Sequence, residues 1–158
     1  MREVHNIQPI YDENSRILIL GSFPSVKSRE IQFFYGHPQN RFWRIMERLF
    51  STTLNTIEEK KIFLISNNIA LWDTIGSCEI KGSADDTIEN IVPNDLSLIL
   101  DNSKVERIFC NGAKSYDLYM KHIYPKTEIK PTKLPSTSPA NATWSLDRLC
   151  GTWKEILV

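Results

Sequence analysis

Two segments of the chain combine turn residues with hydroxyl side chains, a composition that suits phosphate binding. Residues 21–25 read GSFPS, and residues 134–141 read LPSTSPAN. Prolines restrict the backbone and can hold neighbouring amides and hydroxyls outward, where they donate hydrogen bonds to phosphate oxygens. Either segment could equally be an ordinary turn at the end of a strand.

Four further side chains are of types that can bind or transform a flat polar ligand: Tyr35, Asn40, Asp73 and Asn111. An aromatic ring can stack on a flat ligand, whereas amides and carboxylates offer hydrogen bonds to its polar groups. Structural roles are open to all four. Tyr35 could be a core aromatic, and Asn111 could favour a left-handed turn. Asn40 and Asp73 could each cap a helix.

The composition indicates a globular protein with a single domain over residues 1–158. Of its residues, 41% are hydrophobic and 24% are charged. The longest apolar stretches are too short to cross a bilayer, and the first residues lack the apolar segment of a secretory signal. We therefore expect a cytoplasmic protein that makes no membrane contact.

Neither a metal nor an organic cofactor is expected. The three cysteines, Cys78, Cys110 and Cys150, stand far apart, so they predict neither a disulfide framework nor a metal centre. The glycine-rich patterns GxGxxG and GxxxxGK[ST] do not occur. Dinucleotide and nucleoside triphosphate sites of the common kinds therefore have no support.

The net charge of zero conceals an uneven distribution. Residues 26–48 and 104–133 are basic, whereas residues 52–101 are acidic. If the two basic segments fold onto one face, that face can hold a polyanion. The alternative is that these charges lie on separate solvated helix faces.

Short apolar runs and helical periodicities alternate along the chain. Runs such as RILIL, each closed by a turn residue, are typical of buried parallel strands, and the segments between them repeat apolar residues at helical spacing. We predict strands at residues 16–20, 69–72, 105–110 and 128–134. We predict helices at residues 40–50, 57–68, 94–100 and 113–124, and a closing helix that carries Leu146, Leu149, Trp153 and Ile156.

This order of elements predicts an α/β fold with three layers, α/β/α, around a central, mainly parallel four-stranded sheet. In such sheets ligands bind outside the carboxyl ends of the strands. The segments that follow Leu20, Trp72, Cys110 and Leu134 are therefore where a site is expected. These are the segments that carry most of the candidate side chains.

Taken together, the motifs resemble the uracil-DNA glycosylase superfamily. Its members pair a G-x-x-P turn after the first strand with a P-S-x-x-S-like loop after the last, as residues 21–24 and 135–138 do here. Residues 34–43, FYGHPQNRFW, look like the F-A-H-P-x-N-R-F-W segment of the mismatch-specific uracil/thymine glycosylases, and residues 109–112, FCNG, look like their F-N-G turn. With ALWD at residues 70–73, the set is most similar to the hypoxanthine-DNA (deoxyinosine) glycosylase branch. The resemblance covers nearly the whole chain.

The resemblance implies a DNA repair enzyme that flips a deaminated base, hypoxanthine and secondarily uracil, out of DNA and hydrolyses its N-glycosidic bond. It would act as a monomer and need no cofactor. The residues that would bind the base are Ser22, Phe23, Tyr35, Asp73 and Asn111. Those that would contact DNA are Ser25, Lys27, Lys133, Ser136, Thr137, Ser138 and Pro139, with Arg29 adding positive potential.

The chain departs from the mismatch-specific branch at one mechanistic position. That branch has an asparagine that positions the water immediately before the motif proline, whereas this chain has Phe23. The hypoxanthine branch is expected to use the asparagine of the HPxN segment instead, which makes Asn40 the expected catalytic residue. Leu134 likewise stands where other branches carry histidine or asparagine. Residues 138–140 are expected to fill the gap left by the flipped base.

Three alternatives remain open from the sequence. The chain could be a mismatch-specific uracil-DNA glycosylase, or a non-catalytic protein of this fold that binds damaged DNA, which the missing asparagine would permit. A serine hydrolase using Ser22 or Ser136 with His37 is disfavoured because no GxSxG segment is present.

Overall fold

The computed structural model describes residues 2–4, 7–81 and 87–157. Its centre is a four-stranded sheet in the order β3-β2-β6-β7, in which every neighbouring pair is parallel. This confirms the predicted α/β class with a parallel four-stranded sheet. The strands are β2 (Ile17–Gly21), β3 (Ile69–Asp73), β6 (Arg107–Asn111) and β7 (Thr132–Leu134).

The two strands β2 and β3 are buried along their whole length. Helices cover both faces of the sheet, so side chains on either face of these strands are buried, which explains their apolar sequences. The polar exception is Asp73, the last residue of β3. β7 is shorter than the predicted strand 128–134. Glu128 ends the preceding helix in a left-handed conformation, with φ of 57°, so the strand begins only at Thr132.

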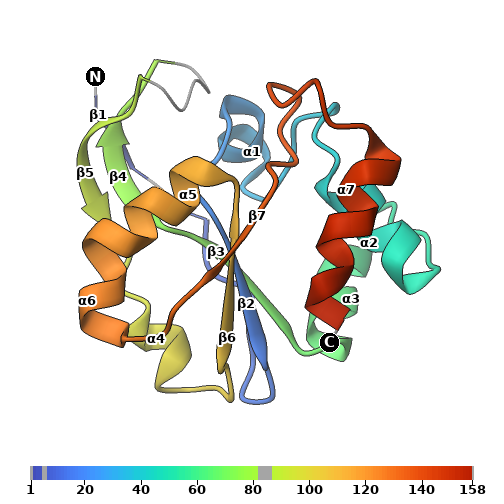
Figure 1. Ribbon diagram of the computed structural model, residues 1–158, viewed down its shortest axis with the longest axis horizontal. Helices are drawn as coiled ribbons and strands as arrows, with labels where there is room; N and C mark the ends of the chain where they lie inside the picture. Colours follow the sequence, from blue (N-terminus) through green and yellow to red (C-terminus); the bar gives the residue numbers. More distant parts are fainter. Residues whose placement is uncertain (1, 5–6, 82–86, 158) are drawn as a thin grey trace.

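Helices on two sides of the sheet complete three layers (Figure 1). One side carries α2 (Phe42–Phe50), α3 (Ile57–Ser66) and α7 (Leu146–Trp153). The other carries α4 (Ser97–Leu100), α5 (Ala113–Leu118), the π-helical turn η2 (Tyr119–Ile123) and α6 (Tyr124–Thr127). The predicted helix 113–124 thus continues through three segments, whereas the predicted helix 94–100 shortens to its last turn.

Two parts of the fold were not predicted from the sequence. Residues read as a loop form the short helix α1 (Val26–Ile31), directly after β2. A second, antiparallel sheet in the order β1-β4-β5 contains β1 (Arg2–Val4), β4 (Ile75–Glu79) and β5 (Glu89–Pro93). A single residue, Thr74, joins β3 to β4, and its backbone N–H donates to the carbonyl of Gly21 at 2.8 Å.

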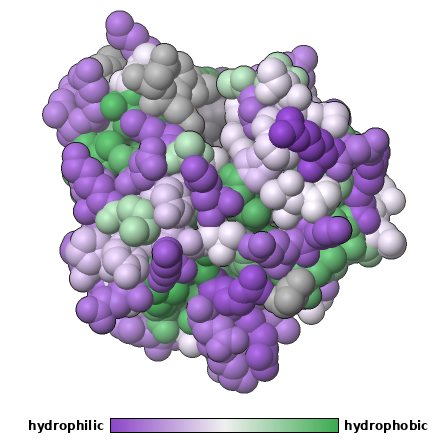
Figure 2. All heavy atoms as spheres, in the orientation of Figure 1, coloured by the Kyte–Doolittle hydropathy of each residue, from purple (hydrophilic) through white to green (hydrophobic). Residues whose placement is uncertain are grey.

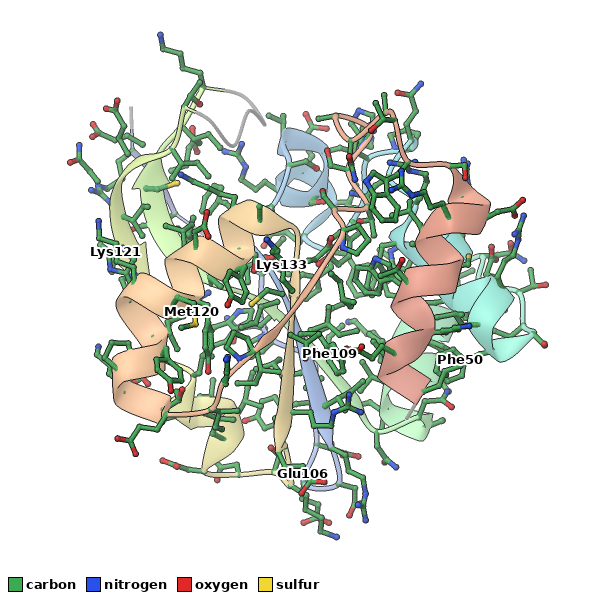
Figure 3. All side chains as sticks on the ribbon, viewed as in Figure 1. Phe50, Glu106, Phe109, Met120, Lys121 and Lys133 are labelled. Atoms are coloured by element: carbon green, nitrogen blue, oxygen red, sulfur yellow. The ribbon has the colours of Figure 1, made fainter. Side chains whose placement is uncertain are left out.

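The main core lies between the central sheet and its helices. Phe109 of β6 is fully buried and lies near the middle of the molecule in Figure 3. A smaller cluster, in which Phe23, Ile75, Cys78, Ile88 and Leu118 are buried, connects the antiparallel sheet to the rest. Hydrophilic side chains cover most of the face seen in Figure 2, with hydrophobic ones showing between them. None of the described helices is long and apolar enough to cross a membrane.

Candidate active site

A cavity of about 570 Å³ opens at the carboxyl ends of the parallel strands. Five separate segments line it: residues 21–28 in part, residues 34–40 in part, Asp73, Asn111 and residues 136–140. In Figure 1 this is the end of the sheet where α1 and the loop after β7 lie. Every candidate site residue named from the sequence lines the cavity except Lys27, Arg29 and Lys133.

Gly21 and Asp73 form one wall of the cavity, because β2 and β3 pair with these two residues in register. Asp73 is 3% exposed. Its Oδ1 occupies the space that a Cβ on Gly21 would need, and the hydroxyl of Tyr35 lies 3.1 Å from the same point. The absence of a side chain at residue 21 therefore allows a carboxylate and a phenol to come together beside the cavity.

Tyr35 is held in an unusual backbone conformation. Its φ is 53°, in the left-handed region that a residue with a side chain adopts at a cost. Its ring stacks on Phe42 with 4.2 Å between centroids and 17° between planes. The hydroxyl is buried and has no hydrogen-bond partner in the described part of the chain. Burial, and secondarily the negative charge of Asp73, raise the pKa of Tyr35, so the phenol stays protonated.

Asn40 lies two residues before the start of α2, and its side-chain oxygen accepts two hydrogen bonds. Oδ1 accepts from the backbone N–H of Phe42 at 2.9 Å and from the hydroxyl of Thr137 at 2.8 Å. The first bond closes an Asx turn directly before α2. The N-cap of α2 is Arg41, so the alternative that Asn40 is itself the N-cap is wrong. The second joins the helix to the loop after β7. Asn40 thus combines a turn-forming bond with a position in the cavity lining.

Thr137 connects the two asparagines of the site. Its backbone N–H donates to Asn111 Oδ1 at 3.0 Å, and its Oγ1 accepts from Asn111 Nδ2 at 3.0 Å. The same hydroxyl donates to Asn40. Thr137 is 1% exposed, so its hydroxyl is turned inward rather than toward a phosphate. Asn111, expected to bind the base, hydrogen-bonds to Thr137 through both its amide oxygen and its amide nitrogen.

Arg41 is a structural residue of the site that sequence reasoning missed. Its guanidinium donates to the backbone carbonyls of Ser138 at 2.9 Å and Asn141 at 3.0 Å, and also to that of Trp144. Its backbone N–H donates to the carbonyl of Thr137 at 3.1 Å. The arginine of the HPxNRFW segment was the available signal, but it was counted only as a surface charge.

The loop after β7 is shaped by its own hydroxyls. Ser136 Oγ accepts from the N–H of Ser138 at 3.1 Å, and Ser138 Oγ accepts from the N–H of Ala140 at 3.1 Å. Because each hydroxyl accepts within the loop, its proton can be directed at a ligand. Ser136, Ser138 and Pro139 are half-buried and line the cavity. Ser25 instead caps α1, with its Oγ accepting from the N–H of Ser28 at 3.1 Å.

The expected cations lie outside the cavity lining. Lys27 is exposed, 3.9 Å from Glu30, and the Lys133 ammonium lies over the Tyr116 ring at 5.5 Å, on β7 in Figure 3. Arg29 forms an ion pair with Glu3 at 3.1 Å, and its guanidinium lies 5.2 Å from the centre of the Phe23 ring. Arg29 therefore supports Phe23, which is 8% exposed at the cavity wall.

The chemistry available in this cavity is that of hydrogen-bond donors and one carboxylate. Among the described residues, no group of three or more His, Cys, Asp or Glu could hold a metal ion. His37 Nδ1 accepts from the backbone N–H of Gln39 at 3.1 Å, which orders the loop before α2. Such a site suits a reaction in which charge develops on a leaving group and is stabilised by fixed dipoles.

Comparisons with known proteins agree with this geometry. A family model described as the uracil DNA glycosylase superfamily matches residues 8–156. A protein of Methanosarcina acetivorans named hypoxanthine DNA glycosylase is 35% identical over 144 residues, which are 88% of this chain and 89% of that protein. One of the same name from Methanosarcina barkeri is 33% identical over 152 residues, 93% of each.

A solved structure extends the likeness to the fold. The solution NMR structure of a candidate uracil DNA glycosylase from Methanosarcina acetivorans matches with a TM-score of 0.81 and 30% identity, covering 100% of both chains. All five segments that line the cavity fall within the matched residues.

Proposed function

Because the chain belongs to the uracil-DNA glycosylase superfamily and is a DNA glycosylase, we propose that it releases hypoxanthine from DNA by flipping the deaminated nucleotide into the cavity at the carboxyl ends of the parallel strands. The two relatives named hypoxanthine DNA glycosylase support this choice of base. The observation that carries the proposal is the convergence of Tyr35, Asp73, Asn40 and Asn111 on one cavity. Its volume of about 570 Å³ lies within the range of ligand pockets.

The base edge is read by Asp73 and the neighbouring backbone. Hypoxanthine presents an acceptor at O6 and a donor at N1–H. Asp73 accepts from N1–H, and the backbone at Ser22 or Phe23 donates to O6. Adenine reverses both groups, so that its binding would leave buried polar atoms unpaired at a cost of about 1–3 kcal/mol each. Uracil presents the same order of groups on a smaller ring and would be the second substrate.

The chemistry is hydrolysis of the bond between C1′ and the base nitrogen. The electron pair of that bond leaves with the base, the sugar gains oxocarbenium character, and a water oxygen bonds to C1′. The water gives up one proton, and the base ends protonated, so the products are the free base and an abasic site. No lysine is among the described residues that line the cavity, which favours water over an amine as the nucleophile.

The DNA backbone would be held by the loop after β7, chiefly Ser136, Ser138 and Pro139. Lys27 and Lys133 are exposed and contribute at longer range. A monomer would suffice for this chemistry, because Asp73, Asn40 and the loop after β7 all line the same cavity. Cys110 and Cys150 form no disulfide among the described residues, which fits a reducing compartment such as the cytoplasm.

A panel of end-labelled duplexes tests the proposal. Each duplex carries hypoxanthine, uracil, xanthine, ethenoadenine or intact adenine at one position, and alkali after incubation converts abasic sites into strand breaks. We expect breaks at hypoxanthine at least as fast as at uracil, and none at adenine. Binding to these duplexes without any break would show a non-catalytic damage-binding protein. Rapid release of uracil with none of hypoxanthine would show a uracil-specific enzyme.

A further inference from the structure

The side-chain oxygen of Asn40 has no capacity left for substrate or water. A carbonyl oxygen has two lone pairs, and Oδ1 accepts one hydrogen bond from Phe42 and one from Thr137. Nδ2 has no hydrogen-bond partner among the described residues, and Asn40 lines the cavity. The side chain therefore offers the cavity an N–H donor and not an acceptor.

The orientation of this amide is fixed by backbone donors. The N–H of Phe42 can only donate, so the atom that faces it must be the oxygen of Asn40. The N–H of Thr137 likewise requires the oxygen of Asn111, which leaves Asn111 Nδ2 facing the Thr137 hydroxyl. That hydroxyl must then direct its proton to Asn40 Oδ1. The two fixed donors leave one consistent arrangement of the three side chains.

We infer that Asn40 acts on the substrate as a hydrogen-bond donor, through Nδ2, to the negative charge that develops on the departing base, and that Thr137 is the positioning residue that sets this orientation. The inference rests on the proposed function and differs from the water-positioning role that the resemblance suggests for Asn40. As the C1′–N bond breaks, its electron pair moves into the base, and a fixed N–H at the cavity wall stabilises that charge without reorganising. Water attacks from elsewhere in the site.

Asn40→Asp distinguishes the two roles. An aspartate keeps the bonds from Phe42 and Thr137 on one oxygen and presents the second oxygen, an acceptor, to the cavity. If Asn40 positions water, the aspartate should retain or increase the rate of base release. If it donates, the rate should fall by about 10² or more, as far as with Asn40→Ala.

Gln39→Glu is the matched control for added charge, because Gln39 is exposed, adjacent in sequence and not part of the cavity lining. Single-turnover release of hypoxanthine and affinity for a duplex with a non-hydrolysable 2′-fluoro-arabino analogue are measured for each variant. We expect Asn40→Asp to bind the analogue within about threefold of Gln39→Glu while its rate falls about 10². An affinity loss as large as the rate loss would indicate a contact to phosphate and overturn the inference.

Thr137→Val tests the positioning role, since valine keeps the shape and removes the hydroxyl. We expect about a tenfold loss of rate with unchanged affinity for the analogue, and Thr137→Ser should regain most of it. Thr143→Val, at an exposed threonine of the same loop, controls for the loss of a hydroxyl. When Asn40 is already alanine, Thr137→Val should lower the rate of base release no further. If Thr137 were merely structural, Thr137→Val would lower the rate by the same factor with and without Asn40.

The failure of this inference is separable from the failure of the proposed function. If the wild-type protein releases no base from any duplex, the proposed function is wrong. If the wild-type protein is active and Asn40→Asp retains its rate, the function stands and Asn40 is an acceptor. Equal effects of Thr137→Val with and without Asn40 would remove Thr137 from the mechanism.

Discussion

Gly21 and Asp73 end two neighbouring parallel strands in register, and the carboxylate of Asp73 occupies the space that a side chain on residue 21 would need. Adding any side chain at residue 21 would therefore force this buried carboxylate to move from its place beside Tyr35. The glycine of the GSFPS segment is therefore required by the position of the group proposed to read the base.

Gly21→Ala should displace the carboxylate of Asp73 or the hydroxyl of Tyr35. We expect a loss of about 1–3 kcal/mol in the free energy of unfolding, typical of overpacking, and a fall of at least about tenfold in base release. Thermal unfolding and single-turnover assays measure the two effects. Gly151→Ala is the matched control, because a Cβ there meets nothing within 4 Å and the residue lies inside α7. It should stabilise the protein by up to about 1 kcal/mol, with an unchanged rate.

Replacing Arg41 should loosen the loop after β7. Methionine would leave without partners the three carbonyls that Arg41 now binds, so we expect Arg41→Met to cost about 2–4 kcal/mol of stability and to weaken DNA binding. Urea unfolding and titration with a labelled duplex check both. Arg44→Met should change stability little, since exposed Arg44 makes one hydrogen bond of 3.5 Å, to Pro38. Equal losses in the two variants would mean that only the charge matters.

Two tyrosines should respond in opposite directions to the loss of a hydroxyl. The Tyr35 hydroxyl is buried without a partner, so Tyr35→Phe should raise stability by about 1 kcal/mol. Base release should remain within about threefold, because the ring that stacks on Phe42 is kept. The Tyr119 hydroxyl is 2.7 Å from Thr127 Oγ1 and donates to the carbonyl of Ile129 at 2.6 Å. Tyr119→Phe should therefore destabilise by about 1–2 kcal/mol, and melting curves that moved together would contradict the assignment.

Asp73→Ala should slow the release of both hypoxanthine and uracil, since both bases would lose the acceptor for their ring N–H. We expect a fall of about 10²-fold on each, the size usual when a buried polar contact to substrate is lost. The labelled duplexes described above give the rates. Asp117→Ala, at an exposed position of α5, should leave them unchanged. Slower release of one base alone would show that Asp73 does not read the shared edge.

Activity should survive incubation with EDTA. The proposed leaving group needs hydrogen bonds and not a Lewis acid, and the described residues contain no cluster of metal ligands. The strand-break assay is repeated after chelation and dialysis. Complete loss that zinc or magnesium restores would require a different account of the cavity.

Most of the central sheet could be predicted because β2 and β3 are buried along their whole length and β6 is buried at its centre. Short continuous apolar runs such as ILIL in β2 are typical of strands buried on both faces, and a turn residue after the run marks the end of the strand. The antiparallel sheet escaped prediction for the opposite reason. Its strands are largely exposed or half-buried. In β5, for example, no residue is fully buried, and the sequence ENIVP shows neither a long apolar run nor strict alternation of apolar and polar residues.

The sequence predicted which residues lie around the cavity, but not which of them hydrogen-bond to one another. Motifs placed Asn40, Asn111 and Thr137 near the same edge of the sheet, since each follows a strand or a turn there. Their hydrogen bonds depend on side-chain directions that neither spacing nor composition contains. The sequence predicted that the Thr137 hydroxyl would bind phosphate, whereas in the structure Thr137 is buried and its hydroxyl donates to Asn40.

The bond between Asn40 and Thr137 joins residues 97 positions apart, and this has a consequence for biosynthesis. A ribosome adds about 5–20 residues per second, so a nascent chain carries β2, β3 and β6 for about 1–5 s before Thr137 is added. During that interval Asn40 Oδ1 lacks the Thr137 donor, and the carbonyls bound by Arg41 do not yet exist. A message truncated before codon 137 would therefore yield a protein with most of its sheet and no organised catalytic amide, and damaged bases would be cleaved only by chains whose last strand had been translated.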